Sequence, residues 1–539
     1  VILTFERFVD WILKYNHLML DRLIKSKLNP IFRLTWIKTL ILIFLLWLPV
    51  LVILLPGTMA IDGQRQMDEF FRTSIPSISF KYFPTNHHPW IASLWQGFLM
   101  KIGMTLSGGN VNYGLLVHSV FLMVISLMSY SYLAMTVKKY YGQLAGLLTV
   151  IFLGLYPHFV NYAMLYDKTG WYQAFFIVFF VSIFRYLMSE KRATLVFCVI
   201  ISGILTSLFR SNGFMIVFVV MFSMLILIKQ RKQIFVMTLL IILPVMIWSH
   251  IALPALNVMP ASPGERMNVQ FQQISRIYLL HHNNFSTLDK KTLSAVIPLN
   301  KIKDNYNSQS ADGIKEQFFI NSFLITYDDF ANMKGNWNWY KSNAYKNKIR
   351  SFNHLWLKML LKYPKDAAFA TLKNKYIDIT PSLNRGNDIS TFTGGLSNYV
   401  IINNQWTAQY EHFISDKNAK KLSVYYSYWA KSPILNLLVN TGLYTWLAIA
   451  LGVFWFKRRK TRELPFVIGV ILVVLINFAG ARNGDFRYCV PFVALTPIIV
   501  GIIINNYRSR QTIYYNREYV KKLTLKYRKR AEKSESAVT

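Results

Sequence analysis

Long runs of apolar residues divide this chain, and short polar segments separate most of them. Each run is close to the roughly 17–25 residues that an α-helix needs to cross a bilayer. The pattern predicts an all-α, polytopic membrane protein with about ten transmembrane helices. They lie near residues 36–55, 113–136, 143–162, 171–188, 193–209, 213–228, 233–253, 434–456, 464–480 and 488–505.

The segment 90–106 is also apolar, but it carries Gln96 and Lys101. If it does not span, the basic N-terminal arm and every later basic loop share one side of the membrane, as the positive-inside rule requires of cytoplasmic segments. We therefore predict an amphipathic helix on the outer surface, with both termini cytoplasmic. The basic segments then placed inside are Lys138-Lys139, Arg185 with Lys191-Arg192, Lys229–Lys232, Lys457–Lys460 and the tail from Arg508 to Lys533.

This topology divides the chain into five predicted parts. They are an amphipathic cytoplasmic arm (1–34), a membrane core (35–253) with a first outer loop (56–112), an extracytoplasmic domain (254–433), C-terminal membrane helices (434–505) and a basic cytoplasmic tail (506–539). The outer domain is rich in Asn, Lys, Tyr and Trp. Helical patterns near 270–281, 314–324, 345–361 and 365–376 predict that it is mostly helical.

Composition supports this assignment. The chain has 539 residues, 53% hydrophobic and 16% charged, whereas a soluble domain carries about 25% charged residues. Its net charge of +35 lies beside the apolar runs, which favours cytoplasmic loops over a nucleic-acid surface. Cys198 and Cys489 both lie in apolar runs and indicate no disulfide or zinc site. The first 34 residues are charged and a long apolar run follows, so we expect no cleavable signal peptide.

Candidate chemistry gathers in the first outer loop, where acidic residues interrupt a basic protein. Asp62, Arg65, Asp68 and Glu69 follow the first helix, and His87-His88-Pro89 comes later in the same loop. The next outer turn contributes Asp167-Lys168, the third begins at Arg210, and the last runs from Arg482 through Asp485 to Arg487-Tyr488. Because all these turns are predicted at the outer face, their side chains can converge there.

Carboxylates and guanidinium groups on one surface suit a reaction with an anionic leaving group. A carboxylate can deprotonate an attacking hydroxyl, while Arg and Lys hold phosphate oxygens. We take Asp62 and Asp167 as candidate catalytic residues. The candidate substrate-binding residues are Arg65, Asp68, Glu69, His87, His88, Lys168, Arg210, Arg487 and Tyr488.

Structural alternatives stay open for these residues. Asp62 could solvate a loop, Asp68 and Glu69 could form the solvated face of a short helix, and Asp167-Lys168 could be a local ion pair. His88 and Pro89 fit the start of an interfacial helix. Arg210 could extend to lipid headgroups, and Arg487-Tyr488 could anchor a helix at the interface.

The same residues resemble those of the GT-C class of integral-membrane glycosyltransferases, and more closely an uncharacterised branch from Gram-positive bacteria. The resemblance rests on Asp62 soon after the first helix, on Asn86-His87-His88-Pro89, on Asp167-Lys168, and on the Arg-Tyr-x-x-Pro pattern from Arg487 to Pro491. Phe271–Arg276 is similar as well. Many relatives place two adjacent acids at the first-loop site, whereas Gly63 follows Asp62 here, with Asp68-Glu69 further on.

The resemblance implies an enzyme of the cell membrane that moves a sugar from a polyprenyl-phosphate donor to an extracytoplasmic acceptor. The acceptor would be a cell-wall polymer, a glycolipid or a protein, and the anomeric carbon would be inverted. Asp62 would be the base, Lys168, Arg210 and Arg487 would neutralise the leaving lipid phosphate, and a histidine would orient a substrate. Nothing in the sequence demands a metal, although a divalent ion held by Asp62 and Asp167 stays an alternative.

Other functions remain as rivals. A flippase or transporter of lipid-linked sugars would place ionisable residues in mid-membrane and show inverted repeats, and we find no repeat. A polysaccharide polymerase would need no acidic residue at the Asp62 position. A scaffold without activity is the third alternative.

Overall fold

The computed structural model describes residues 33–75, 80–188, 193–318, 343–380, 413, 416–458, 461–480, 483–484 and 486–504. Most of them are helical, and the strands are only two residues long. The long apolar helices are α3 (Trp36–Leu54), α6 (Val111–Tyr141), α7 (Gln143–Leu155), α9 (Lys168–Leu187), α10 (Ala193–Phe209), α11 (Ser211–Leu227), α12 (Arg231–Ile247), α24 (Thr441–Arg458) and α25 (Leu464–Gly480). The protein is therefore all-α, as predicted. The predicted basic tail and residues 1–32 of the predicted arm lie outside the described residues.

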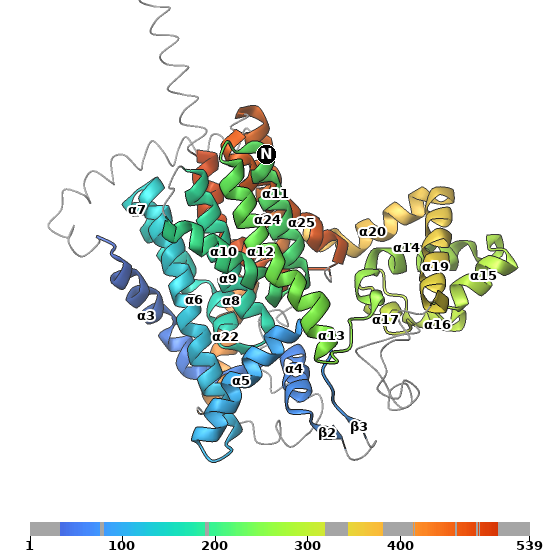
Figure 1. Ribbon diagram of the computed structural model, residues 1–539, viewed down its shortest axis with the longest axis horizontal. Helices are drawn as coiled ribbons and strands as arrows, with labels where there is room; N and C mark the ends of the chain where they lie inside the picture. Colours follow the sequence, from blue (N-terminus) through green and yellow to red (C-terminus); the bar gives the residue numbers. More distant parts are fainter. Residues whose placement is uncertain are drawn as a thin grey trace, which may run out of the picture.

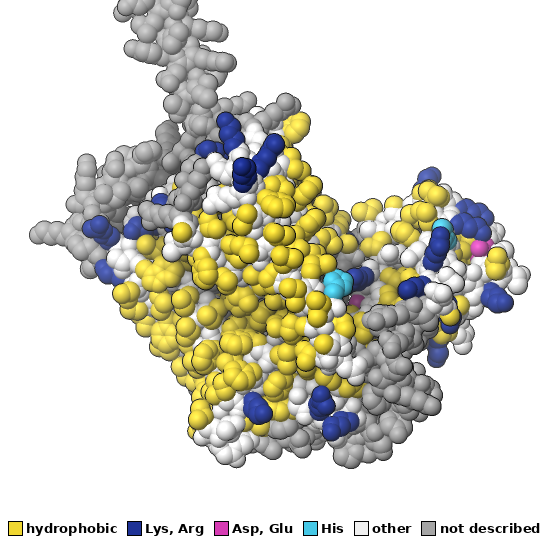
Figure 2. Space-filling view, in the orientation of Figure 1, with side chains coloured by type: hydrophobic (Ala, Val, Ile, Leu, Met, Phe, Trp, Pro, Cys, Tyr) yellow, Lys and Arg dark blue, Asp and Glu magenta, His cyan; other side chains and the backbone are white. Residues whose placement is uncertain are grey.

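These helices form a membrane-spanning bundle. Within the described residues, five helices are long and apolar enough to cross a membrane, beginning at Trp36, Val111, Lys168, Arg231 and Thr461, and a sixth span results if α7 and α8 (Pro157–Ala163) count as one. The helices α10 and α11 are apolar but shorter. Figure 2 shows a broad hydrophobic surface over the bundle, with Lys and Arg above and below it. Such a belt is the exterior expected of a protein in a bilayer.

All ten predicted spans are helical, but three are broken. The span predicted at 143–162 bends by 63° between α7 and α8, because Pro157 occupies the first turn of α8 and disfavours helical backbone before it. The span at 434–456 divides into α23 (Pro433–Leu438) and α24. The last span opens with a 3₁₀ turn, η8 (Phe486–Tyr488), and α26 (Val490–Ala494). Length and composition thus support five or six spans, and ten remains a prediction.

Helix α9 lies at the centre of the bundle. It packs against α6, α10 and α26, and 83% of its apolar window is buried. Its phenylalanines stack along one side, with the rings of Phe176 and Phe180 4.4 Å apart, and Phe180 meets Phe466 near the start of α25. This packing fixes α9 and therefore the position of its first residue, Lys168.

The first loop folds against one end of the bundle. It contains α4 (Ile61–Phe71), the hairpin of β2 (Ser74–Ile75) and β3 (Phe80–Lys81), and α5 (Trp90–Leu106). In Figure 1, α4, α5 and the hairpin gather at the lower end of the molecule. Helix α5 packs against α4 and α6. The helix predicted at 90–106 is thus confirmed, and its place on the outer membrane surface stays a prediction.

A second helical unit projects from the right side of the bundle in Figure 1. It comprises α14 (Asn268–His281), α15 (Thr287–Ser294), α16 (Leu299–Asn305), α17 (Asp312–Lys315), α19 (Asn343–Lys362) and α20 (Pro364–Ile379). It has its own apolar core, which includes Phe271, Ile274 and Phe352. By contrast, α22 (Asp416–Lys431), which the sequence analysis assigned to the same insertion, buries Tyr426 in the bundle core. The helix predicted at 314–324 is described only to residue 318, where α17 is a single turn.

Candidate active site

A short parallel strand pair brings the first loop to the start of α9. Strand β1 (Thr58–Met59) pairs with β4 (Leu165–Tyr166), with Met59 opposite Tyr166. Asp62 comes three residues after β1, and Lys168 comes two residues after β4. Because parallel strands run in the same direction, the segments that follow them emerge side by side.

Gly63 permits the close contact of α4 with β4. A Cβ atom at this position would lie 1.7 Å from the carbonyl oxygen of Tyr166. Any larger residue would push the first turn of α4 away from that strand. The sequence analysis treated Gly63 as a departure from a pair of adjacent acids, whereas the structure gives it a steric role.

Lys168 is the centre of the site. Its ammonium nitrogen lies 3.0 Å from Asp62 Oδ2, 2.9 Å from His88 Nδ1 and 3.6 Å from Asp167 Oδ2. Arg487 adds a second cation, since its Nη1 donates to Asp62 Oδ2 at 2.7 Å. We call Asp62, His88, Asp167, Lys168 and Arg487 the Lys168 cluster. Four separate segments of the chain supply it.

The backbone at Lys168 is held from two sides. Asp167 caps α9, and its Oδ1 accepts a hydrogen bond from the Thr169 amide at 2.7 Å. Gln66 Oε1 accepts from the Lys168 amide at 3.4 Å, and Gln66 Nε2 donates to Ser93. Gln66 was not among the site residues predicted from sequence. Its position four residues after Asp62 on one helix face was the available signal.

The surroundings of Asp62 and His88 determine the charge of each side chain. Burial would raise the pKa of the Asp62 carboxyl, but the Lys168 ammonium and the Arg487 guanidinium outweigh burial and hold that pKa well below its usual range. Burial and the Lys168 charge lower the pKa of His88 far below its ordinary value. At neutral pH His88 is therefore uncharged, and its Nδ1 accepts a hydrogen bond from the Lys168 ammonium.

His87 faces a different partner. Its Nδ1 lies 3.7 Å from Glu265 Oε1, in the turn η3 (Pro263–Arg266) that precedes the outer unit. Burial and the positive charge of Arg65 lower the pKa of His87 to about 3. The ring of His87 lies 4.5 Å from that of His88. His87 thus links the Lys168 cluster to the outer unit, and Glu265 is a second residue that the sequence analysis missed.

Arg487, Tyr488 and Arg210 form an adjoining group. The guanidinium carbon of Arg210 lies 4.5 Å from the centre of the Tyr488 ring, and that of Arg487 lies 5.0 Å from the same centre. Arg487 also donates to the Tyr488 hydroxyl at 3.2 Å. Arg210 is only 8% exposed. Among the described residues no carboxylate forms an ion pair with it, so it is a buried cation that aromatic faces stabilise.

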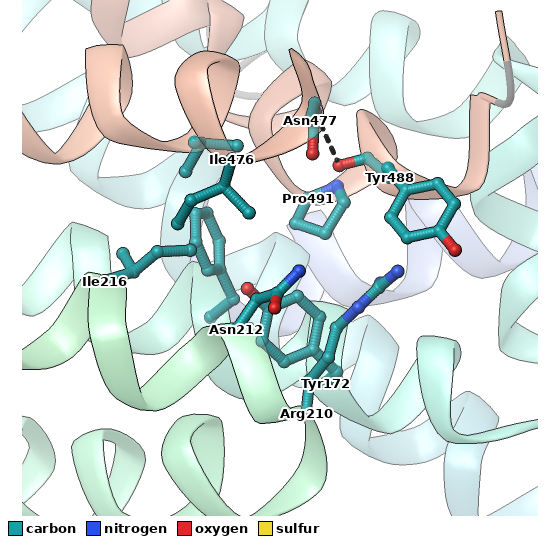
Figure 3. Close-up of a pocket in the computed structure, with 10 residues that line it drawn as sticks. Tyr172, Arg210, Asn212, Ile216, Ile476, Asn477, Tyr488 and Pro491 are labelled. Carbon is teal, nitrogen blue, oxygen red and sulfur yellow. Dashed lines mark hydrogen bonds between the residues drawn. The ribbon is translucent and has the colours of Figure 1, made fainter. Parts of the chain in front are cut away.

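A small pocket opens beside Arg210. Figure 3 shows the Arg210 side chain reaching toward the Tyr488 ring, with Asn212 beside it and Asn477 hydrogen-bonded to the Tyr488 carbonyl. The rest of the lining is largely apolar: Tyr172, Phe176, Ile216, Val473, Ile476 and Pro491. The pocket thus joins a cationic end to an apolar wall.

The outer unit forms hydrogen bonds with the turn that carries Arg487. Asn483 Oδ1 accepts from the Ile377 amide at 3.0 Å, and the Gly484 amide donates to Asp378 at 3.2 Å. Gly484 has a φ of +69°, and a Cβ there would lie 2.4 Å from Ile377. Glycine suits both constraints. Arg482 and Asp485 of the same turn lie outside the described residues.

The remaining predicted residues lie apart from the Lys168 cluster. Glu69 is fully buried and accepts hydrogen bonds from Arg65 Nε and the Thr85 hydroxyl, both at 2.8 Å. Asp68 is 1% exposed, and its charge, after burial, helps to raise the pKa of Tyr82 to about 12. The alternative that Asp68 and Glu69 form a solvated helix face is therefore wrong.

A divalent metal ion is the alternative occupant of the Lys168 cluster. Among the described residues no group of three or more His, Cys, Asp or Glu side chains is arranged to hold one. Asp62, Asp167 and His88 do converge, but each is directed at the Lys168 ammonium. The residues present thus fit a resident ammonium group and not a bound divalent ion.

Comparison with known proteins gives a family and a distant structural likeness. No curated protein matches the chain in sequence. The archaeal oligosaccharyltransferase AglB from Archaeoglobus fulgidus, solved in complex with an inhibitory peptide and a dolichol-phosphate, is 11% identical with a TM-score of 0.39. The likeness covers 92% of this chain and 52% of AglB, so the chain spans about half the length of that protein. A family model matches residues 17–517, and the chain belongs to that family, the family of unknown function DUF6020.

Proposed function

We propose that this protein is a membrane glycosyltransferase of the GT-C type, which moves a sugar from a polyprenyl-phosphate donor to a hydroxyl group of an extracytoplasmic acceptor. The observation that carries the proposal is the meeting of one partly exposed carboxylate, Asp62, with the cations Lys168 and Arg487. The buried cation Arg210 lies next to them through Tyr488. The GT-C resemblance of the sequence motifs agrees with this chemistry.

The pocket beside Arg210 supports a lipid phosphate as the leaving group. A guanidinium group without a carboxylate partner among the described residues suits phosphate oxygens. Most side chains next to it are apolar, as is the prenyl chain that follows such a phosphate. A lipid-linked phosphate presents both features in this order.

The orientation of the bundle favours a site on the outer side. Helix α6 ends near Lys138-Lys139 and α9 ends near Arg185, whereas α9 begins at Lys168. The Lys168 cluster is therefore at the opposite end of α9 from basic residues that the positive-inside rule assigns to the cytoplasm. Its members also lie near helix ends, which does not match the mid-membrane ionisable residues expected of a flippase.

In the proposed reaction, the acceptor oxygen attacks the anomeric carbon while the bond between that carbon and the phosphate oxygen breaks. The phosphate leaves with the bonding electrons, and Arg487, Arg210 and Lys168 stabilise its charge. Asp62 takes the acceptor proton. A single displacement of this kind inverts the anomeric carbon.

The low pKa of Asp62 belongs to the substrate-free protein. A carboxylate paired with two cations is a weak base, because its negative charge is already stabilised. The donor phosphate competes for Arg487 and Lys168, and its binding releases Asp62 from those partners. The carboxylate then recovers affinity for a proton when the acceptor is in place.

Cleavage of a set of synthetic donors tests the function. Purified protein in nanodiscs is given polyprenyl-phosphate hexoses and pentoses together with hydroxyl-bearing acceptors of each proposed class (a cell-wall polymer, a glycolipid and a protein), and release of polyprenyl phosphate is measured. We expect cleavage of at least one donor and a loss of about a hundredfold in the Arg487→Ala variant, as when one stabilising donor of a transition state is removed. Lys101→Ala, an exposed change on α5, is the control. Wild-type rates in Arg487→Ala, or no cleavage of any donor, would contradict the proposal.

A further inference from the structure

Three side-chain atoms of the Lys168 cluster are of the kinds that bind metal ions. Asp62 Oδ2, His88 Nδ1 and Asp167 Oδ2 come from three different segments and surround one point. Oxygen and imidazole nitrogen are the ligands that Mn²⁺ and Zn²⁺ take in proteins. That point is occupied by the ammonium nitrogen of Lys168.

Asp167 provides an independent sign that the point is built for a cation. The side chain is 1% exposed, and its Oδ2 makes no hydrogen bond among the described residues. The positive charge near Oδ2 is that of the Lys168 ammonium, whose nitrogen lies 3.6 Å away. A buried carboxylate oxygen needs such a charge, because its transfer out of water is otherwise strongly unfavourable.

The distances fit an ammonium group and are too long for a metal. The three ligand atoms lie 2.9, 3.0 and 3.6 Å from Lys168 Nζ, which are hydrogen-bond and ion-pair separations. Ligands of Zn²⁺ lie at about 2.0–2.2 Å. Relative to the position of Lys168 Nζ, the Asp62 and His88 atoms would need to move inward by about 1 Å and the Asp167 atom by about 1.5 Å, and side-chain rotations achieve such shifts.

We infer that the Lys168 ammonium is a built-in cation that holds the place of a divalent metal ion between Asp62, His88 and Asp167, and that shortening Lys168 converts this cluster into a metal site. The first part of this inference, on metal binding, rests only on the positions of Asp62, His88 and Asp167 around Lys168. A second part, that the wild-type enzyme turns over without a divalent ion, rests on the proposed function.

The backbone contacts make the conversion feasible. Gln66 and Asp167 hold the main chain at the start of α9 through the amides of Lys168 and Thr169. Neither contact involves the Lys168 side chain. Removal of that side chain therefore leaves the backbone around Asp167 held and opens a volume between the three ligand atoms. Arg487, which contacts Asp62, is then the remaining cation of the cluster.

The test compares Mn²⁺ binding by full-length proteins in detergent, followed by isothermal titration calorimetry and by the EPR signal of free Mn²⁺. We expect Lys168→Ala to bind about one Mn²⁺ per chain at least tenfold more tightly than the wild type. The Lys168→Ala/Asp167→Asn protein should lose that gain, and Lys101→Ala should behave as the wild type. Zn²⁺ should bind Lys168→Ala more tightly than Mn²⁺.

Two outcomes overturn the inference. One is a folded Lys168→Ala protein, monodisperse on gel filtration, that binds Mn²⁺ no better than the wild type. The other is a wild-type protein that binds Mn²⁺ and loses it in Asp62→Asn, and this measurement stands even if Lys168→Ala does not fold. With a cleavable donor in hand, wild-type cleavage should persist in EDTA. Absence of cleavage would contradict the proposed function and leave the binding result intact.

Discussion

Helix α4 carries two carboxylates with opposite surroundings. Glu69 is fully buried, and its partners Arg65 and Thr85 lie 4 and 16 residues away in sequence. The side chain of Asp62 is 20% exposed, and its partners Lys168 and Arg487 lie 106 and 425 residues away. Glu69 thus stabilises the local structure of the first loop, whereas Asp62 connects segments that are distant in sequence and remains partly exposed.

This difference separates a structural ion pair from a candidate catalytic one. Burial raises the pKa of Glu69 despite its hydrogen bonds with Arg65 and Thr85, whereas the cations lower that of Asp62 against burial. Protein groups already occupy Glu69 Oε1, and the buried side chain has no access to a substrate. Asp62 has two cations that a phosphate can draw away, and an exposed edge through which an acceptor can approach.

Replacing Asp62 should have the largest effect on activity. In Asp62→Asn, donor cleavage should fall by about 10²–10⁴-fold, the range expected for loss of a general base. Farnesyl phosphate, a short prenyl phosphate, should bind about tenfold more tightly in tryptophan fluorescence titrations, because the competing carboxylate is gone. Farnesol is the uncharged control ligand. Full activity of Asp62→Asn would refute the assignment of the base.

Disturbing the contact that delivers Asp62 should come next. In Gly63→Ala the new Cβ would clash with the Tyr166 carbonyl oxygen, so α4 must move away from β4. We expect donor cleavage to fall at least tenfold and stability to fall by about 1–3 kcal/mol, as in overpacked cores. Thermal unfolding and the cleavage rate are the measurements. Gly480→Ala, where a Cβ meets nothing within 4 Å, should change neither.

Removing Glu69 should act on stability instead of chemistry. In Glu69→Ala the Arg65 and Thr85 groups lose their partner, which costs about 2–3 kcal/mol when a charged group is left unsatisfied. The cleavage rate per folded molecule should stay within about twofold. Asp304→Ala, at an exposed site, should leave the unfolding temperature unchanged. If Glu69→Ala stayed stable and lost cleavage, the contrast between the two carboxylates would fail.

The smallest effect concerns His87. Its pKa is lowered from 6.5 to about 3 in the folded protein, so the unfolded chain binds a proton first as pH falls. Stability should therefore decrease below about pH 6.5, by about 1.4 kcal/mol for this residue at pH 5.5. Unfolding temperatures of wild type and His87→Gln at pH 7.5 and 5.5 check this, with exposed His354→Gln as the control. An unchanged pH slope in His87→Gln would contradict the assignment.

The helices of the bundle could be predicted from sequence because their signal is local. A long apolar run fixes a helix wherever it lies, so the cores of α3, α6, α9 and α25 fall where the apolar pattern places them. The breaks were harder to predict. Pro157 bends one span. At the break between α23 and α24, the Asn440 side chain accepts a hydrogen bond from the Gly442 amide. Such breaks depend on which backbone groups find hydrogen-bond partners.

The candidate site divides in the same way. From the sequence we predicted that Asp62, His88, Lys168 and Arg487 lie in outer turns, but their contacts could not be predicted. Gln66 and Glu265 escaped notice, since a glutamine in a polar helix and a glutamate in a long insertion carry no pattern of their own. The role of Gly63 depends on a carbonyl oxygen of Tyr166, about one hundred residues away.

The sequence by itself determined the class of the molecule: an all-α membrane protein with acidic residues in the polar segments between its apolar runs. Hydropathy and charge are properties of single segments, and they decide whether a segment lies in the bilayer or in water. Only the tertiary structure decided which acids share a site. The pairing of β1 with β4 and the packing of α9 place Asp62 beside Lys168, and the outer unit holds the turn that brings Arg487 to the same oxygen. Contacts of this kind depend on how distant segments meet, which local patterns do not record.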